Sequence, residues 1–148
     1  MGNFQKTVKE LIQIGWDIQL LGYQQCTVKI YDNLDVLVIP TLLPEAFGLT
    51  AIEAMAREVV VISNRAGELT DIIHNKVNGF FYNSKHFDEL IPILQDLLDQ
   101  KYDISDIRHH GLETVRQHYH PTKQMEKLHS LLAEGVLKEA ETAVALQD

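Results

Sequence analysis

Hydrophobic residues follow two alternating patterns along this chain. Short continuous apolar runs, rich in β-branched residues, predict strands buried on both faces. Apolar residues spaced three and four positions apart predict helices that cover them. The predicted strands occupy residues 17–22, 35–39, 59–63 and 79–82. The predicted helices occupy residues 4–15, 25–34, 48–57, 68–74, 87–98, 105–118 and 121–132.

This alternation predicts an α/β fold, a Rossmann-like parallel sheet with helices on both faces and a helical C-terminal part. A doubly wound nucleotide-binding sheet has about six strands and opens on a strand. The pattern here gives fewer strands and opens on a helix, so we expect the first strands of the sheet to be missing from the chain. The expected organisation is a partial nucleotide-binding domain over residues 1–130 and a helical tail over residues 131–148.

The length and the net charge of the chain argue against some classes of protein. The chain has 148 residues, the size of one domain, and a formal net charge of −8, which argues against a nucleic-acid or anionic-membrane surface. Its single cysteine, Cys26, cannot form an internal disulfide, which favours a reducing compartment. No apolar run approaches the ~20 residues of a membrane span, and no signal peptide is evident. We expect a cytoplasmic protein, peripheral to a membrane only through parts not present here.

The most informative stretch follows the predicted strand at residues 35–39. A short loop leads into a helix that opens on Phe47 and Gly48. The backbone N–H groups of Gly48, Leu49 and Thr50 belong to the first helical turn, where amides lack intrahelical partners. With the positive end of the helix dipole they attract phosphate, and Gly48 lets a ligand approach the backbone closely.

Two glutamates flank this helix start. Glu45 lies in the loop, and Glu53 lies in the second turn of a helix that is apolar almost all round, so we expect Glu53 to be buried. A buried carboxylate needs hydrogen-bond partners, and sugar hydroxyls are suitable ones. The plainer interpretation stays open, because acidic residues near helix N-termini are common for structural reasons alone.

The pattern extends beyond this corner. The motif at residues 45–56 is followed by VVVISN at 59–64, GELTDII at 67–73 and VNGFFY at 77–82, and it is preceded by LLGY at 20–23. Together these segments resemble the donor-binding C-terminal domain of the retaining glycosyltransferases that have two Rossmann-type domains, the GT-B architecture, in the family-4-like group 1. The likeness covers roughly residues 20–82 with specific motifs.

The resemblance implies a role for each residue of the corner. Glu45 would be the catalytic-site carboxylate that contacts the hydroxyls of the donor sugar. Phe47, Gly48 and Leu49 would offer backbone amides to the sugar and the diphosphate, and Thr50 would lie against phosphate. The activity implied is transfer of a sugar to an acceptor hydroxyl with retention of configuration.

The resemblance also implies the ligands and partners. Glu53 would hold the ribose of a UDP-, GDP- or ADP-linked sugar, and Tyr23 and Gln24 would border the base. No metal or other cofactor is expected, because backbone amides would bind the phosphates. The acceptor-binding N-terminal domain of such enzymes is missing from this sequence, so the chain alone is expected to be inactive.

One basic residue and two alternative functions complete the prediction. The family's diphosphate-binding Arg and Lys come from strands that are absent here, and Arg65, after the strand at 59–63, is a candidate substitute. The histidines show no zinc-site spacing. The chain could instead be a non-catalytic nucleotide-binding or self-associating module, using an exposed sheet edge or its tail. An epimerase of the same architecture is the other alternative.

Overall fold

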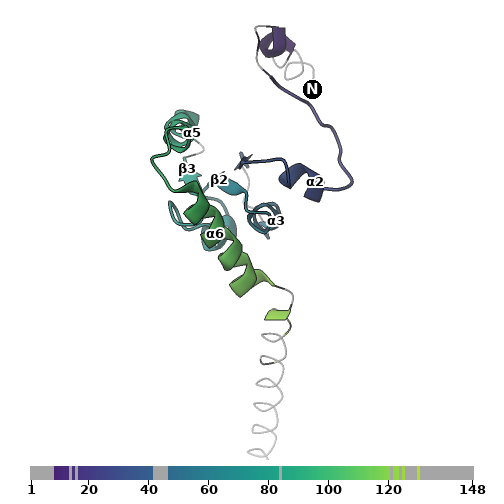
Figure 1. Cartoon of the computed structure of the whole chain (residues 1–148), viewed down its shortest axis with the longest axis vertical. Helices are drawn as coiled ribbons and strands as arrows, with labels where there is room; N and C mark the ends of the chain where they lie inside the picture. Colours follow the sequence, from purple (N-terminus) through teal and green to yellow (C-terminus); the bar gives the residue numbers. More distant parts are fainter. Residues whose placement is uncertain are drawn as a thin grey trace, which may run out of the picture.

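The computed structural model describes residues 9–13, 15, 17–41, 47–83, 85–120, 122–123, 125 and 130. Figure 1 shows a small α/β body, with an N-terminal segment extending from it. The named elements are α2 (Val28–Tyr31), β1 (Val36–Ile39), α3 (Leu49–Met55), β2 (Val60–Asn64), α4 (Leu69–Ile72), β3 (Phe80–Tyr82), the 3₁₀ turn η1 (Phe87–Glu89), α5 (Leu90–Leu98), α6 (Ile104–Thr114) and the π-helical turn η2 (Val115–Tyr119).

The described strands form a parallel sheet in the order β1-β2-β3. Val36 lies opposite Val60 at the start of the β1–β2 pair, and Asn64 lies opposite Tyr82 at the end of the β2–β3 pair. Every residue of β2 is buried, as expected for a continuous apolar run between two strands and two helical layers. Because the strands are parallel, their carboxyl ends meet at one edge of the sheet.

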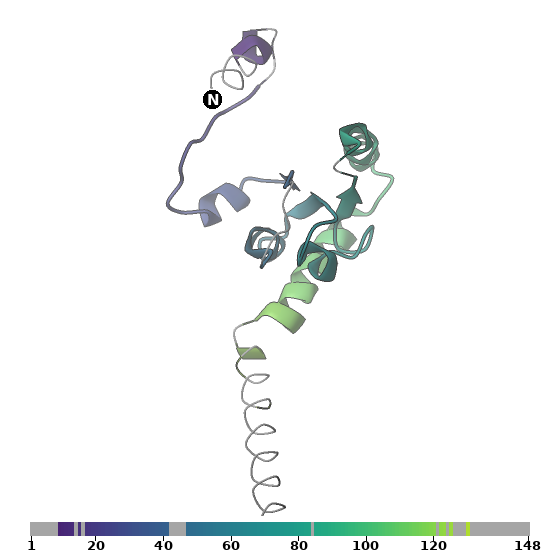
Figure 2. The same ribbon diagram turned by 180° about the vertical axis from the view of Figure 1, so that it is seen from behind.

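Helices cover both faces of this sheet, which confirms the predicted fold class. Side chains alternate along a strand, so Val59 and Val61 join a cluster with α3 and α4, whereas Val60 and Ile62 join a second cluster with α5 and α6. Figures 1 and 2 show the two layers on opposite sides of the strands. The second cluster includes an edge-on contact between the Phe80 and Tyr102 rings, whose centroids are 5.0 Å apart.

The predicted strand at residues 17–22 is wrong. Residues 17–24 belong to no helix or strand and pair with no strand among the described residues, and the side chains of Leu20 and Leu21 are 58% and 54% exposed. The segment runs beyond the β1 side of the sheet, away from β3 (Figures 1 and 2). An apolar run becomes a strand only when a neighbour takes its backbone hydrogen bonds.

The remaining predicted elements differ from the structure mainly in length. The helix predicted at 25–34 is one turn, Val28–Tyr31, and the helix predicted at 105–118 ends as the π-helical turn η2. Of the predicted opening helix, residues 9–13 are helical, and Gly15 follows them with a φ of 99°. The predicted tail at 131–148 lies outside the described residues.

Asn78 ties the helical layer to the loop before β3. Its side chain is 2% exposed, its Oδ1 accepts from the His74 N–H at 2.6 Å, and its Nδ2 donates to the Ile72 carbonyl and the Thr114 Oγ1, both at 3.0 Å. One amide therefore joins the end of α4 to the end of α6. Buried polar groups held in this way are costly to remove because their partners stay buried.

We expect Asn78→Ala to lower the free energy of unfolding by about 2–4 kcal/mol, because it leaves the buried Ile72 carbonyl and two partly buried groups without this partner. Urea unfolding followed by circular dichroism measures this loss. Asn33→Ala is the matched control, since Asn33 is exposed and donates only to the Lys29 carbonyl; its expected cost is below about 1 kcal/mol. Equal losses for the two variants would contradict the bridging role of Asn78.

Candidate functional site

The carboxyl edge of the sheet is where the start of α3 and Arg65 lie. The chain leaves β1 at Pro40, leaves β2 at Arg65 and leaves β3 at Asn83. Helix α3 begins at Leu49, on the connection that leaves β1 and returns to β2. In open parallel α/β sheets, ligands bind at this edge, outside the carboxyl ends of the strands.

Gly48 forms the corner at which α3 begins. Its backbone is left-handed, with φ 61° and ψ 24°. Its carbonyl accepts the first helical hydrogen bonds, from the N–H groups of Ala51 at 3.0 Å and Ile52 at 3.1 Å. The amides of Leu49 and Thr50 precede these donors and so have no acceptor within the helix. Helix α3 therefore begins at this corner, close to the predicted position.

Packing gives a second reason for glycine at position 48. A Cβ built on Gly48 would collide with Ile72 Cδ1 of α4 and would lie 3.4 Å from Leu69 Cδ2. The Gly48 Cα therefore faces the α4 side chains. The conformation and the close approach to α4 both require glycine, in addition to any contact with a ligand.

The structure places Glu53 differently from the prediction. Its side chain is exposed instead of buried, although Ala54 and Met55 beside it are fully buried. Its Oε2 atom accepts hydrogen bonds from Thr27 Oγ1 at 3.3 Å and from Tyr31 Oη at 3.2 Å. The carboxylate thus has an accessible side and a side fixed by hydroxyl groups from α2.

Tyr31 is the residue of this site that the sequence did not single out as functional. Its side chain is 7% exposed, and its hydroxyl also holds Glu53. Burial raises the pKa of Tyr31, and the negative charge and hydrogen bond of Glu53 raise it further. Thr27 and Tyr31 are four residues apart, so their shared helical face was the signal available in the sequence.

The other residues predicted on α3 face outward. Phe47 and Leu49 are 73% and 59% exposed, and Thr50 is exposed beside them. These side chains and the adjoining amides are accessible to a ligand at the start of α3. Glu45 lies outside the described residues, so its role as the catalytic carboxylate stays a prediction.

Tyr23 and Gln24 lie in the extended segment before α2. Tyr23 is 90% exposed, and the Gln24 Nε2 donates to the Leu21 carbonyl at 2.6 Å. Within the described residues, no hydrogen bond joins either side chain to α3. The structure therefore does not bring these two residues to the α3 corner, and their contact with a base stays a prediction.

Arg65 lies at the carboxyl edge, as its position after β2 predicts. Its guanidinium carbon is 4.7 Å from the centre of the Phe81 ring, a cation–π contact on the β3 side. It lines a hollow there together with Asn75 and Glu89. Its role at a diphosphate stays a prediction.

Asn64, the last residue of β2, is a further polar group at this edge that the sequence did not indicate. It is 4% exposed, and its Oδ1 accepts no hydrogen bond from the described part of the chain. Buried polar atoms are nearly always paired with protein, water or ligand. Asn64 is therefore an available acceptor at the edge where the predicted site residues lie.

Metal-binding clusters and membrane-spanning helices are both absent from the described residues. Among them, no group of three or more His, Cys, Asp or Glu side chains is arranged to hold a metal ion. No helix in that same part of the chain combines the length and the apolar character needed to cross a membrane.

An α/β domain with a Rossmann-like parallel sheet is thus the class that the fold defines, and sequence comparison gives the family. The sequence model of the family "Glycosyl transferases group 1" matches residues 2–114. The chain belongs to this family, as its motifs predicted. Among curated relatives, the capsular polysaccharide biosynthesis glycosyltransferase CapM of Staphylococcus aureus is 28% identical over 125 residues, which cover 84% of this chain and 32% of CapM.

Solved structures share the fold of this chain. The C-terminal domain of a group 1 family glycosyl transferase, LpcC of Francisella tularensis, is 29% identical, with a TM-score of 0.68 over 80% of this chain and 64% of that one. HepE of Anabaena, solved in complex with UDP, has a TM-score of 0.78 over 88% of this chain and 36% of its own. At 18% identity, HepE shows the fold alone.

The chain is short beside its relatives. It spans 29% of an uncharacterised 42.6 kDa protein from the cps region of Klebsiella pneumoniae, 29% identical over 109 residues. It spans 32% of CapM. The matched region therefore corresponds to about a third of these proteins.

The Gly48 corner leads to a prediction about stability. We expect Gly48→Ala to lower the free energy of unfolding by about 2–4 kcal/mol, because the left-handed backbone costs roughly 1–2 kcal/mol and the contact with Ile72 adds overpacking. Thermal unfolding measures this loss. The control is Gly22→Ala, since Gly22 has a φ of 64° but nothing within 4 Å of an added Cβ. If Gly22→Ala lowers the free energy of unfolding as much as Gly48→Ala does, the packing explanation is wrong.

Tyr31 leads to a prediction about alkaline pH. Its folded-state pKa is raised, so the unfolded chain releases this proton first, near pH ~10. The stabilisation is complete below that pH and is lost as the pH rises through the raised folded-state pKa. We expect the unfolding free energy of Tyr31→Phe to fall less steeply above pH ~10 than that of the wild type. Tyr23→Phe, which changes an exposed ring, should keep the wild-type slope in the same urea titrations.

Proposed function

We propose that this chain is the donor-binding part of a glycosyltransferase that transfers a sugar from a nucleotide-sugar to an acceptor hydroxyl with retention of configuration. Family membership supports the reaction class. The titles of the HepE structures name UDP, UDP with glucose, and UDP-glucose as the molecules bound to that protein. A nucleoside diphosphate sugar is accordingly the donor class that we assign to this chain.

The observation that carries the proposal is the arrangement of Glu53 on α3. Its carboxylate is exposed, yet two hydroxyls from α2 fix one of its oxygens. A fixed carboxylate with an accessible side can accept both hydroxyls of a ribose, whose diphosphate would then extend toward the start of the same helix. Asp or Glu is a suitable acceptor for such diols because it has several lone-pair positions on two oxygens.

The start of α3 supplies the second part of the chemistry. As the bond between the sugar and the diphosphate breaks, negative charge grows on the departing phosphate. The amides of the first turn of α3 lack acceptors within the helix, so they would stabilise that charge without reorganisation. Such preorganised donors lower the barrier more than donors that must first turn away from water. Thr50 would add a hydroxyl beside the phosphate.

The remaining roles follow the family pattern. Glu45 would orient the donor sugar through its hydroxyls, and the acceptor hydroxyl would attack from the side on which the diphosphate departs. We propose that no metal takes part, because the helix amides bind the phosphates. An N-terminal domain, of the kind that the longer relatives are large enough to contain, would bind the acceptor. We therefore expect the 148 residues alone to transfer little or no sugar.

Binding of UDP by the purified chain tests the donor site. We expect calorimetric titration to detect UDP, and we expect Glu53→Gln to weaken its affinity about 10- to 100-fold, the loss of a charged hydrogen bond worth ~1.5–3 kcal/mol. The loss should shrink for 2′,3′-dideoxy-UDP, which lacks the hydroxyls that Glu53 would hold. Glu58→Gln is the control, because Glu58 is exposed just beyond the other end of α3.

Two results would count against this function. If the wild-type chain binds none of UDP, GDP and ADP, the proposed donor site is wrong. If Glu53→Gln loses the same affinity for UDP and for its dideoxy analogue, the proposed contact with the ribose is wrong, although nucleotide binding itself would stand.

A further inference from the structure

A polar hollow lies at the carboxyl edge of the sheet, at the end of β3. It has a volume of about 440 Å³, which lies within the range of small-molecule sites. It is lined by residues at the ends of β2 and β3 and by residues from the segments on either side of β3, namely Arg65, Asn75, Phe81, Tyr82, Asn83 and Glu89. The proposed donor site does not use this hollow.

Three of its polar side chains are held in place by one atom each. Asn75 Oδ1 accepts a hydrogen bond from the Phe81 N–H at 2.9 Å, and Asn83 Oδ1 accepts one from the Lys85 N–H at 3.0 Å. Glu89 Oε2 accepts one from the Asn83 N–H at 2.9 Å. The second polar atom of each side chain has no hydrogen-bond partner in the described part of the chain. Two amide donors and one carboxylate acceptor are therefore fixed and available.

Arg65 adds a fourth polar group. Its guanidinium lies over the Phe81 ring, 4.7 Å from the ring centre, and it forms no hydrogen bond or ion pair with any described residue. The other arginines of the chain each form an ion pair with a carboxylate; they are Arg57, Arg108 and Arg116. The ring contact thus positions the N–H donors of Arg65 beside the hollow and leaves them available.

The hollow combines donors with an acceptor and has no net charge, because the charges of Arg65 and Glu89 cancel. A phosphate or another small anion offers only acceptors, and the Glu89 carboxylate would repel it. A hydroxyl group both donates and accepts, so several hydroxyls on one ring can use both kinds of group. This chemistry suits an uncharged saccharide better than an anion.

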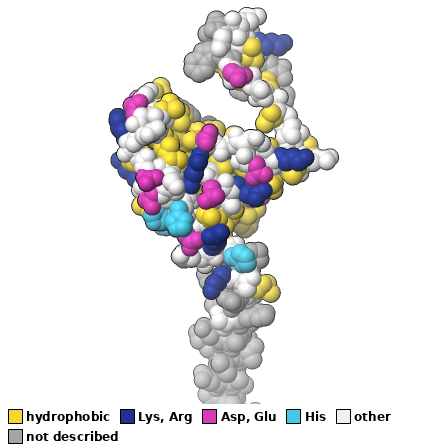
Figure 3. All heavy atoms as spheres, viewed as in Figure 1, with side chains coloured by type: hydrophobic (Ala, Val, Ile, Leu, Met, Phe, Trp, Pro, Cys, Tyr) yellow, Lys and Arg dark blue, Asp and Glu magenta, His cyan; other side chains and the backbone are white. Residues whose placement is uncertain are grey.

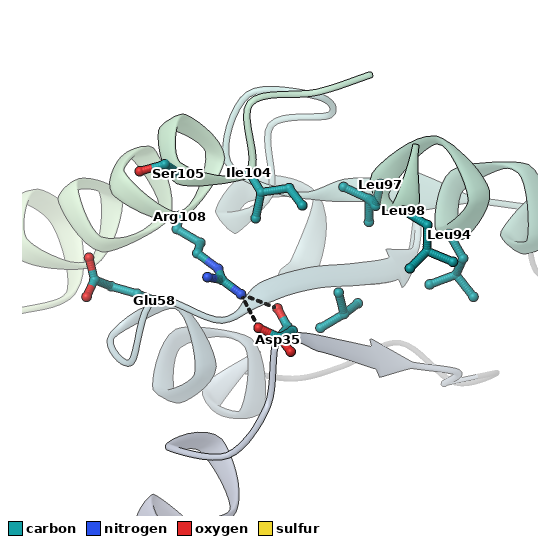
Figure 4. Close-up of a pocket in the computed structure, with 9 residues that line it drawn as sticks. Asp35, Glu58, Leu94, Leu97, Leu98, Ile104, Ser105 and Arg108 are labelled. Atoms are coloured by element: carbon teal, nitrogen blue, oxygen red, sulfur yellow. Dashed lines mark hydrogen bonds and ion pairs between the residues drawn. The ribbon is translucent and has the colours of Figure 1, made fainter. Parts of the chain in front are cut away.

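A second hollow, an apolar groove by the start of β1, has the opposite chemistry. Its volume is about 710 Å³, and its arginine, Arg108, already donates to Asp35 at 2.7 Å. Figure 4 shows the apolar side chains of its wall, Leu94, Leu97, Leu98 and Ile104. Figure 3 shows apolar side chains gathered beside α5. Sugar hydroxyls would find few partners in this groove, so the polar hollow is the better saccharide site.

We propose that the polar hollow at the end of β3 binds an uncharged saccharide unit, separate from the sugar that the donor carries. Neighbouring strands lie ~4.8 Å apart, so the ends of β1 and β3 are about 10 Å apart along one edge. In the glycosyltransferase proposed above, this unit belongs to the part of the acceptor that reaches the donor-binding half. That assignment rests on the proposed function, whereas binding of the saccharide does not.

NMR titration of the isotope-labelled 148-residue chain tests this proposal in the absence of nucleotide. The probes are the methyl glycosides of glucose, galactose, mannose and N-acetylglucosamine, with inorganic phosphate as the anion, each at millimolar concentration. We expect at least one glycoside to shift the side-chain amide signals of Asn75 and Asn83. The signal of Asn33, an exposed amide bonded to the Lys29 carbonyl, should not move, and phosphate should leave all three unchanged.

Two exposed acids of η1 provide matched variants. Glu89 lines the hollow, whereas Asp88 beside it does not. Glu89→Gln keeps an oxygen for the Asn83 N–H but replaces the available acceptor with a donor. We expect it to weaken glycoside binding about fivefold to tenfold, and we expect Asp88→Asn, which removes the same charge, to have no effect. A bound anion would respond in the opposite direction, because Glu89→Gln removes a repulsive charge.

Three results would overturn the proposal. The first is that no glycoside shifts the amide signals of Asn75 and Asn83. The second is that phosphate shifts them and binds more tightly to Glu89→Gln, because the hollow would then be an anion site. The third is equal weakening by Glu89→Gln and Asp88→Asn. The affinity of Glu89→Gln for UDP should equal that of the wild type, so failure of this site and failure of the proposed donor site are told apart.

Discussion

Parallel pairing of β1, β2 and β3 is the constraint on which the rest of this structure depends. β2 lies between two strands and two helical layers and is buried along its whole length. Because all three strands run the same way, their carboxyl ends share one edge, and the chain must cross back over a face between strands. The corner that opens α3 is therefore placed at the edge where open α/β sheets bind ligands.

The site and the fold share residues at this corner. Gly48 gives α3 its left-handed entry and packs against Ile72, so the atoms that expose the helix amides also join α3 to α4. Tyr31 is buried in the core and at the same time holds the carboxylate of Glu53. A ligand at this corner would meet groups whose positions the core already fixes, which is the usual basis of a preorganised site.

The two outer strands of the sheet differ in how far their side chains are buried. On the β3 side, Phe80 and Tyr82 are buried, and the Phe80 ring packs against Tyr102 from the connection between α5 and α6. On the β1 side, apolar residues of the strand are left partly open beside a groove.

The sequence by itself determined the α/β class, the three paired strands, the α3 corner and the family, because each depends on local periodicity or on residue types at short spacing. The prediction that Glu53 is buried was wrong, since an apolar helix can still turn one position toward solvent. Tyr31 and Asn78 act through partners distant in sequence, which periodicity does not show. Residues 17–21 have a strand pattern but no strand, because pairing requires a neighbour. Only the tertiary structure decided these points, since burial, hydrogen bonding and strand pairing are relations between distant segments.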